Sequence, residues 1–195
     1  MSATPNILGR MDLRFLPLAA TVGLFLLMAL AGSVSYTGFF SAQVFLNLLI
    51  DNAFLLIVAV GMTFVILSGG IDLSVGSVVA LSTMVLATLI EHHGWSPLPA
   101  IGVVLVMGVS FGAFMGFLIE RFRLQPFIVT LAGMFLARGL CYLISIDSIS
   151  IGNEAYSTLA YWRLELAEGA SISLGALIAI ACLALALFAA HSSTF

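Results

Sequence analysis

The chain has 195 residues, of which 62% are hydrophobic, and its formal net charge is −3. It carries six basic residues, all arginine, and nine acidic ones, whereas about one residue in four is charged in an ordinary soluble domain. So few charges cannot form a water-facing surface, and the same composition excludes a disordered chain. No basic cluster is present that could neutralise phosphates, which argues against a nucleic-acid partner.

The charges divide the chain into apolar stretches of similar length. Charge-free runs cover 15–50, 52–71, 73–90, 92–119 and 169–195, and the run 124–146 contains only Arg138. A helix needs about 20 apolar residues to cross a hydrocarbon core about 30 Å thick. The pattern predicts an all-α, polytopic transmembrane helical bundle that forms a single membrane-embedded domain over residues 1–195.

Six spans are expected in chain order, because the first run is too long for one helix and the GSVSYTG segment at 32–38 interrupts it. They are placed at 15–35, 45–68, 75–90, 98–119, 126–146 and 171–191. Four prolines fall at or near the expected helix starts, where a missing N–H costs nothing. Residues 147–170 form the only long polar stretch, and their aromatic content favours an interfacial segment outside the membrane.

The first span also has features of a signal peptide, since Arg10 and Arg14 precede an apolar stretch that ends in Ala29-Leu30-Ala31. The stretch is longer than the apolar part of a usual signal peptide, and the following spans need no separate export signal. We therefore expect a retained helix.

Arginine placement predicts the orientation. With the N-terminus in the cytoplasm, Arg10, Arg14, Arg121 and Arg123 are all cytoplasmic and only Arg163 lies outside. Loops rich in basic residues stay on the cytoplasmic side. A multi-pass protein of the bacterial inner membrane with both termini inside is therefore expected.

The fourth span carries glycines at four-residue spacing, Gly108, Gly112 and Gly116, on nearly one helix face. Such a face allows another backbone to approach closely, which drives helix association in lipid. Packing within the chain is favoured here over a dimer interface.

The same span contains a G-x-S-x-G motif around Ser110. In a soluble hydrolase this motif follows a strand, and no strand is expected here. A membrane-embedded serine protease would need a histidine base beside Ser110. His92, His93 and His191 all lie at the ends of expected spans, so the protease hypothesis is not favoured.

Neither a metal site nor a disulfide is predicted. His92 and His93 follow Glu91, but adjacent helical residues point about 100° apart and no fourth ligand is visible. A solvated turn explains them better. Cys141 and Cys182 lie in different spans, where small buried apolar residues are the expected role.

Two charges near or inside expected spans need an explanation. Arg138 lies inside the fifth span, where a cation costs at least about 2.5 kcal/mol at the bilayer centre, and it lies about eight residues from the span's outer end, so its side chain only partly reaches the interface. Two roles for Arg138 remain open. It either pairs with another group or lines a pathway, or it simply lies near the membrane interface. Asp51 is expected near the start of the second span, where the helix dipole favours an acid.

The most distinctive segment is SGGIDLSVGS at 68–77, between the second and third spans. Gly69 and Gly70 can end one helix, and Asp72 or Ser74 can cap the next. A purely connecting turn could be simpler, and non-helical backbone at membrane depth is tolerated only where it is buried or lines a cavity. A functional role is therefore open beside the capping role.

This segment also carries a family resemblance. The sequence NAFLLIVAVGMTFVILSGGIDLSVGSVVAL at 52–81 resembles the signature region of sugar permeases from bacterial ABC importers of the ribose, xylose and galactose type. QPFIVTLAGMFLARGL at 125–140 resembles the second hallmark of the family, and HSSTF at 191–195 resembles the start of its cytoplasmic segment. The 145–159 stretch is similar to the outer loop of galactofuranose-importing members.

The resemblance implies a permease subunit that translocates a monosaccharide, with galactofuranose as one candidate, and that performs no chemistry of its own. It implies four kinds of partner: two ABC ATPase subunits, a second permease subunit, a periplasmic sugar-binding protein and membrane lipid. ATP hydrolysis would belong to the ATPase chains, and the sequence agrees in having no G-x-x-x-x-G-K-[ST] loop. No cofactor and no metal are expected.

Motif match gives the candidate residues for the translocation gate or its hinge. The first candidates are Gly69, Gly70, Asp72 and Ser74, and the second are Gln125, Pro126 and Arg138. The resemblance does not show which of them touches sugar. Family permeases are longer, so an N-terminal portion that is inactive alone is expected. The alternative is a membrane subunit with a structural or interaction role that transports nothing.

Overall fold

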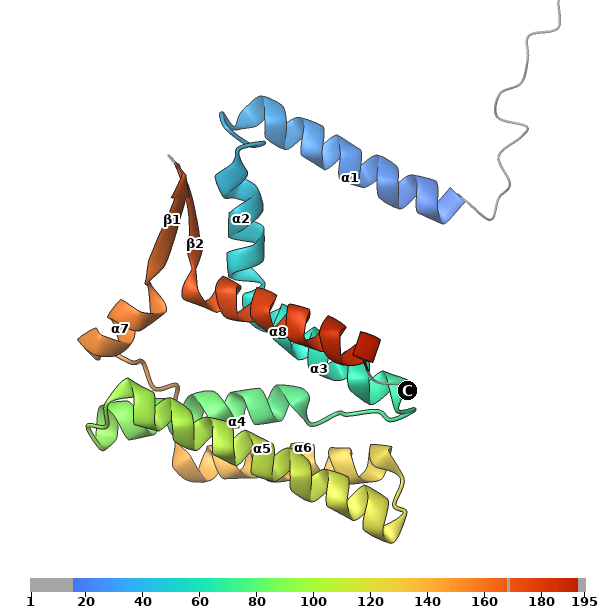
Figure 1. The fold of residues 1–195 in the computed structure, drawn as a ribbon, viewed down its shortest axis with the longest axis vertical. Helices are drawn as coiled ribbons and strands as arrows, with labels where there is room; N and C mark the ends of the chain where they lie inside the picture. The colour runs from blue at the N-terminus through green and yellow to red at the C-terminus, as the bar shows by residue number, and fades with distance from the viewer. Residues whose placement is uncertain (1–15, 168, 193–195) are drawn as a thin grey trace, which may run out of the picture.

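A computed structural model describes residues 16–167 and 169–192 of the chain. It contains helices α1 (Leu16–Ser35), α2 (Ala42–Asp51), α3 (Ala53–Leu67), α4 (Val75–Ala87), α5 (Pro97–Phe122), α6 (Pro126–Ile144), α7 (Glu154–Ala160) and α8 (Leu174–Ser192), a π-helical turn (Thr88–His92), and strands β1 (Arg163–Ala167) and β2 (Ala170–Ser173) (Figure 1). Arg10 and Arg14, which contribute to the predicted orientation, lie outside the described residues, as do residues 193–195.

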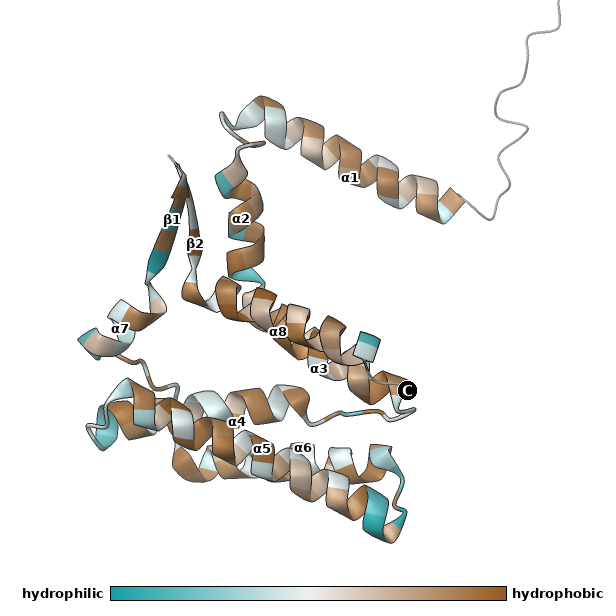
Figure 2. Cartoon of the chain, viewed as in Figure 1, coloured by the Kyte–Doolittle hydropathy of each residue, from teal (hydrophilic) through white to brown (hydrophobic). Residues whose placement is uncertain are grey.

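The predicted class, an all-α polytopic membrane protein, is confirmed. Within the described residues, α1, α4 with its π-helical turn, α5, α6 and α8 are each long and apolar enough to cross a membrane, and the bent pair α2 and α3 gives a sixth candidate. Hydrophobic residues cover the sides of these helices, whereas polar residues gather at helix ends and in the hairpin (Figure 2).

The span expected at 45–68 is not one straight helix, because α2 and α3 meet at an angle of 56°. Asn52 at the break donates its side-chain amide to the Leu48 carbonyl at 2.8 Å, and its own backbone lies outside the helical range. Such side-chain bonds compete with the helical ladder. Asp51 is consequently the last residue of α2 and directly precedes Asn52, the N-cap residue of α3, so it lies at the break and not at the start of one straight span.

The span expected at 171–191 begins later, because residues 171–173 belong to an antiparallel β-hairpin that was not predicted. Arg163 pairs with Ser173 and Leu164 with Ile172, and Gly169 has a φ of 76° near the turn. Helix α8 begins at Leu174 because the Ser173 hydroxyl accepts a hydrogen bond from the Ala176 amide at 3.2 Å, as an N-cap does.

The helices pack in two groups. Helices α4, α5 and α6 contact one another, while α3 and α8 pair and continue into α2 and the hairpin (Figure 1). Small residues mediate the closest approaches, with Ala176, Ala179 and Ala137 fully buried, as is typical of helices in lipid. Helix α1 has no buried residue and stands apart from both groups.

The two ends of the bundle differ in what they carry. The α3–α4 linker (residues 68–74), the α5–α6 turn and the C-terminal end of α8 lie at one end, named here the linker end (Figure 1). The turn between the π-helix and α5, helix α7 and the segment before α7 lie at the other end, named here the opposite end.

Candidate functional site

The α3–α4 linker begins with a complete helix-ending motif. Gly69 has a φ of 75°, a left-handed conformation that glycine adopts without strain. Its N–H donates to Ile66 at 2.9 Å, and the Gly70 N–H donates to Val65 at 3.0 Å. These two bonds define a Schellman motif, which satisfies the last carbonyls of α3. The double glycine therefore ends α3 and turns the chain toward α4.

The linker ends on a polar pair that starts α4. One oxygen of the Asp72 carboxylate, Oδ1, accepts two hydrogen bonds from Ser74, from its N–H at 2.7 Å and from its hydroxyl at 2.6 Å. Ser74 is only 1% exposed, and its carbonyl accepts the first bond of α4, from Val78. Asp72 thus places a negative charge at the N-terminus of α4, where the helix dipole stabilises it.

A threonine in α6 fastens the linker from the side. Thr130 is 4% exposed, and its hydroxyl lies 3.1 Å from the Ile71 carbonyl and 2.9 Å from the Pro126 carbonyl. A hydroxyl has one proton, so the two carbonyls share one donor. Sequence reasoning did not single out Thr130. The sequence feature that could have identified Thr130 is a single hydroxyl residue four positions after Pro126, the proline that starts α6, within the 125–140 motif.

The linker forms one wall of a cavity of about 370 Å³ at the linker end. The other walls come from the end of α3, from α5 and from the start of α6. The lining residues are Val65, Ser68, Gly70, Ile71, Asp72, Gly112, Met115, Gly116, Ile119, Glu120, Pro126 and Thr130. The structure therefore brings the two sequence motifs, 68–77 and 125–140, into one site, named here the linker cavity.

Two further gate candidates, Gly69 and Gln125, each directly precede a residue that lines this cavity. Gly69 shapes the turn, and a Cβ added to it would meet nothing within 4 Å. Gln125 is exposed and precedes α6 as the N-cap residue without a side-chain capping bond. Asp72 therefore lines the cavity, whereas Gly69 and Gln125 shape the backbone next to it.

The glycines of α5 face open space. A Cβ added at Gly108, Gly112 or Gly116 would meet no heavy atom within 4 Å. The tight contact between α5 and α6 is at Gly133 instead, where an added Cβ would lie 2.5 Å from the Met115 sulfur. The α5 glycines make no close backbone contact with another described helix, and two of them line the linker cavity.

Arg138 belongs to a different site. It lines a cavity of about 620 Å³, named here the outer cavity, together with Leu73 of the linker and residues of α4, of α6 and of the segment that follows α6. Arg138 lies on the fourth turn of α6, so the cavity is displaced from the linker end toward the opposite end. Of the second group of candidates, Pro126 lines the linker cavity and Arg138 the outer one.

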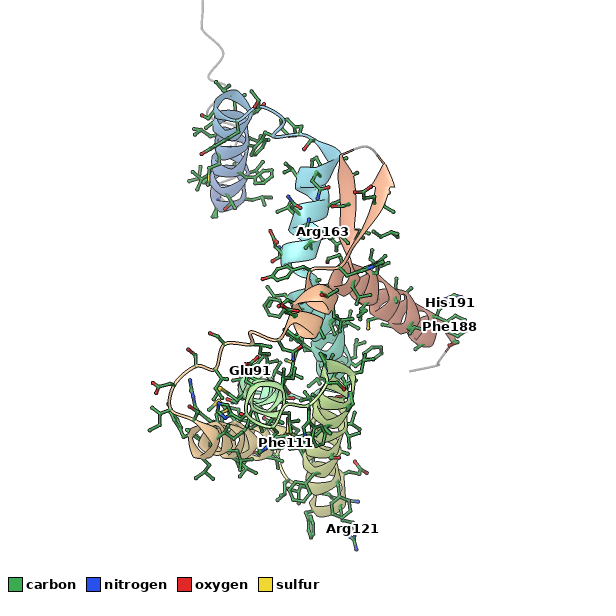
Figure 3. All side chains as sticks on the ribbon, turned by 90° about the vertical axis from the view of Figure 1, so that its left-hand side faces the viewer. Glu91, Phe111, Arg121, Arg163, Phe188 and His191 are labelled. Carbon is green, nitrogen blue, oxygen red and sulfur yellow. The ribbon has the colours of Figure 1, made fainter. Side chains whose placement is uncertain are left out.

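Glu91 has a role that the sequence did not suggest. Its carboxylate oxygen Oε1 accepts hydrogen bonds from the backbone N–H groups of Gly152, at 2.7 Å, and Asn153, at 3.1 Å. Figure 3 shows Glu91 within the group formed by α4, α5 and α6, where the segment before α7 passes. Glu91 therefore ties that segment to the end of α4.

The residues considered for a metal site, a disulfide and a serine protease form no such site in the described part of the chain. No group of three or more His, Cys, Asp or Glu side chains is arranged to hold a metal ion there. Cys141 and Cys182 are free thiols. Ser110 is exposed on α5.

Apolar helices long enough to cross a membrane, joined by a linker that lines a cavity, define a polytopic integral membrane protein. Residues 44–195 match the family described as the permease component of branched-chain amino acid transport systems. The chain belongs to this family.

Among the curated proteins, the relatives of this chain include permeases of sugar importers. The chain is 50% identical over 182 residues to the inner membrane ABC transporter permease protein YjfF of Escherichia coli, which covers 93% of this chain and 55% of the relative. It is 42% identical over 147 residues to the fructose import permease protein FruG of Bifidobacterium longum, covering 74% of this chain and 43% of the relative. For the ribose import permease protein RbsC of Haemophilus influenzae, the identity is 40% over 122 residues, 61% of this chain and 36% of the relative.

These matches confirm the resemblance to bacterial ABC sugar permeases. The chain spans about half the length, or less, of the curated relatives it matches. No solved structure matches it.

Proposed function

We propose that this protein acts as a permease subunit of an ABC importer that translocates a monosaccharide across the bacterial inner membrane. The observation that carries the proposal is the 50% identity over 93% of the chain to an inner membrane ABC permease. Relatives named for fructose, ribose and xylose support a monosaccharide as the substrate class. Galactofuranose is the particular candidate, from the resemblance of residues 145–159.

The partners follow from the same proposal. ATPase subunits bind at the cytoplasmic side and hydrolyse ATP, a periplasmic sugar-binding protein delivers the substrate, and a second permease subunit completes the pathway. The N-terminus lies in the cytoplasm, so the linker end is cytoplasmic and the opposite end faces the periplasm. Arg121 and Arg123 are then both at the cytoplasmic side, as the positive-inside rule favours.

The α3–α4 linker acts as the gate or its hinge in this proposal. It joins the two helix groups, and each of its ends is fixed by local hydrogen bonds, at Gly70 and at Ser74. Its bond to α6 is exchangeable, because the Thr130 hydroxyl can turn from the Ile71 carbonyl to the Pro126 carbonyl. Movement of the linker then replaces one hydrogen bond by another, which avoids the cost of a buried unpaired hydroxyl.

Substitution at Asp72 tests the gate. Asp72→Asn removes the charge but keeps an Oδ1 acceptor for Ser74, whereas Asp72→Ala removes both, and Ser74→Ala removes only one of the two donors. We expect Asp72→Asn to reduce ATP-dependent sugar uptake while the protein inserts into the membrane in normal amounts. If Asp72→Asn takes up sugar normally and only Asp72→Ala fails, Asp72 has a capping role alone.

A second candidate is a membrane subunit that assembles with others and transports nothing. It is favoured by the exposed apolar surface of α1, which buries no residue, and by the open glycine face of α5. Co-purification separates the two functions. An importer subunit isolates with an ATPase and a sugar-binding protein, and a purely structural subunit isolates without them.

A further inference from the structure

The outer cavity combines polar groups from two regions that are distant in sequence, residues 73–84 and residues 134–148. The linker contributes Leu73, α4 contributes Gly76, Ser77, Ala80 and Met84, and α6 contributes Met134, Arg138, Cys141 and Tyr142. Residues 145–148, which follow α6, complete the lining. Its volume of about 620 Å³ is within the range of small-molecule sites, which are apolar cavities with a few convergent polar groups.

We propose that the outer cavity is a monosaccharide-binding subsite of the permease, with Arg138 and Asp147 as its main hydrogen-bonding groups. The inference rests on the proposed sugar transport and adds the place and the residues. It also accounts for Arg138, because an ionisable residue within a membrane-spanning helix is tolerated where it faces the bundle interior or a cavity and not lipid.

The chemistry of the lining favours a neutral, hydroxyl-rich ligand. Arg138 and Asp147 carry opposite charges, so the cavity attracts neither anions nor cations as a class. A guanidinium presents several donors in a plane and a carboxylate presents two acceptors, which suits adjacent sugar hydroxyls. The ring of Tyr142, 63% exposed, offers an apolar face and a polar hydroxyl.

The loop that lines the cavity is held in place at two points. The Ser145 hydroxyl donates to the Asp147 carbonyl at 2.9 Å and accepts from the Asp147 N–H at 3.1 Å, which forms a tight local turn. Further along, Glu91 accepts the Gly152 and Asn153 N–H groups. Asp147 therefore lies on a segment anchored at both ends, as a binding group must be if its position is to be defined.

A branched-chain amino acid is the competing ligand, since its zwitterion could also pair with Arg138 and Asp147. The hydroxyls argue for sugar. Ser77 and Ser148 line the cavity with hydroxyls that the turn at Ser145 does not use, and an amino acid with an aliphatic side chain offers these two hydroxyls fewer partners than a sugar does.

Two native cysteines allow a direct test in membrane vesicles from the host. Cys141 lines the outer cavity, whereas Cys182 lies in α8, away from it. The sugar that the vesicles accumulate is first identified by uptake from a panel of ribose, xylose, fructose and galactose. The alkylation rate of each cysteine is then measured by peptide mass spectrometry with that sugar, with leucine and with neither.

We expect the transported sugar to slow alkylation of Cys141 and to leave Cys182 unchanged. Arg138→Gln is expected to raise the sugar concentration needed for half protection at least about tenfold, as loss of a charged hydrogen bond implies. The matched control is Arg163→Gln, because Arg163 lines a different pocket beside the hairpin and lies in the other helix group (Figure 3).

The outcomes that overturn the inference differ from those that overturn the proposed function. Accumulation of sugar without protection of Cys141, protection by leucine alone, or equal effects of Arg138→Gln and Arg163→Gln would each reject the outer cavity as the sugar subsite. The proposed sugar transport would not be affected, because it rests on the similarity to permeases and not on this cavity. Absence of ATP-dependent accumulation of any sugar would reject the proposed function itself.

Discussion

Thr130 is the residue on which the attachment of the linker to α6 depends. Its hydroxyl is almost fully buried and lies 3.1 Å from the Ile71 carbonyl. Thr130→Val keeps the shape of the side chain and removes the donor. We expect a loss of about 1 kcal/mol in unfolding free energy, the usual net value of one hydrogen bond, together with altered sugar uptake.

Thr130→Ser is the matched control, because it keeps the hydroxyl and removes one methyl group. Thermal unfolding in detergent compares the two variants with the native protein. If Thr130→Val unfolds and transports as the native protein does, the hydroxyl does not fasten the linker.

At the residue scale, local bonds could be predicted and distant ones could not. The double glycine suggests the end of α3 and Asp72 or Ser74 a cap on α4; the structure shows the helix end and a local Asp72–Ser74 bond, but Ser74, the N-cap residue of α4, makes no side-chain capping bond. Thr130 and Glu91 bond to groups 59 and 61 residues away. A single sequence gives no signal for such pairs, because they depend on how the helices pack.

Gln43 joins two elements, helix α2 and strand β2. Its side-chain oxygen accepts the Ser171 N–H at 2.7 Å, and its side-chain N–H group donates to the Ser171 carbonyl at 3.3 Å and to the Asn47 side chain at 2.8 Å. The amide thus covers the free edge of β2 as a neighbouring strand would.

Gln43→Ala is expected to accelerate hydrogen exchange of the Ser171 amide about fivefold, since the lost hydrogen bond is worth about 1 kcal/mol. Asn47→Ala is the control, because it leaves both bonds to Ser171 in place. Exchange measured by mass spectrometry on peptides covering the hairpin gives the comparison. Equal exchange in the two variants would show that Gln43 does not hold the strand.

At the element scale, the spans could be predicted because each needs only a long run without charge. The expected spans at 98–119 and 126–146 correspond closely to α5 and α6. The break at Asn52 and the hairpin could not be predicted in the same way. The break depends on one side-chain bond to Leu48, and the two short strands depend on each other and on Gln43.

At the scale of the whole molecule, the orientation is open to a direct test. We expect Leu124→Cys, in the α5–α6 turn, to react with a membrane-impermeant thiol reagent only in inside-out vesicles, because the turn is cytoplasmic in the proposed topology. Ser96→Cys, before α5, is expected to react only in right-side-out vesicles. The reverse pattern would place the N-terminus outside.

Under the proposed function, the two cavities lie toward different sides of the membrane. The linker cavity lies at the cytoplasmic end and the outer cavity lies nearer the periplasm, and α6 contributes lining residues to both. The sequence identified residues of both, Asp72 and Arg138, but could not assign them to separate sites, because spacing along the chain does not give depth in a packed bundle.

The central claim is that this protein is a permease subunit for a monosaccharide. Its most direct test is disruption of the gene in its host, followed by measurement of the uptake of labelled monosaccharides and labelled leucine. We predict loss of the uptake of one monosaccharide, unchanged uptake of leucine, and recovery with the native gene but only partial recovery with Asp72→Asn. Unchanged uptake of every sugar, or loss of leucine uptake alone, would contradict the proposed function.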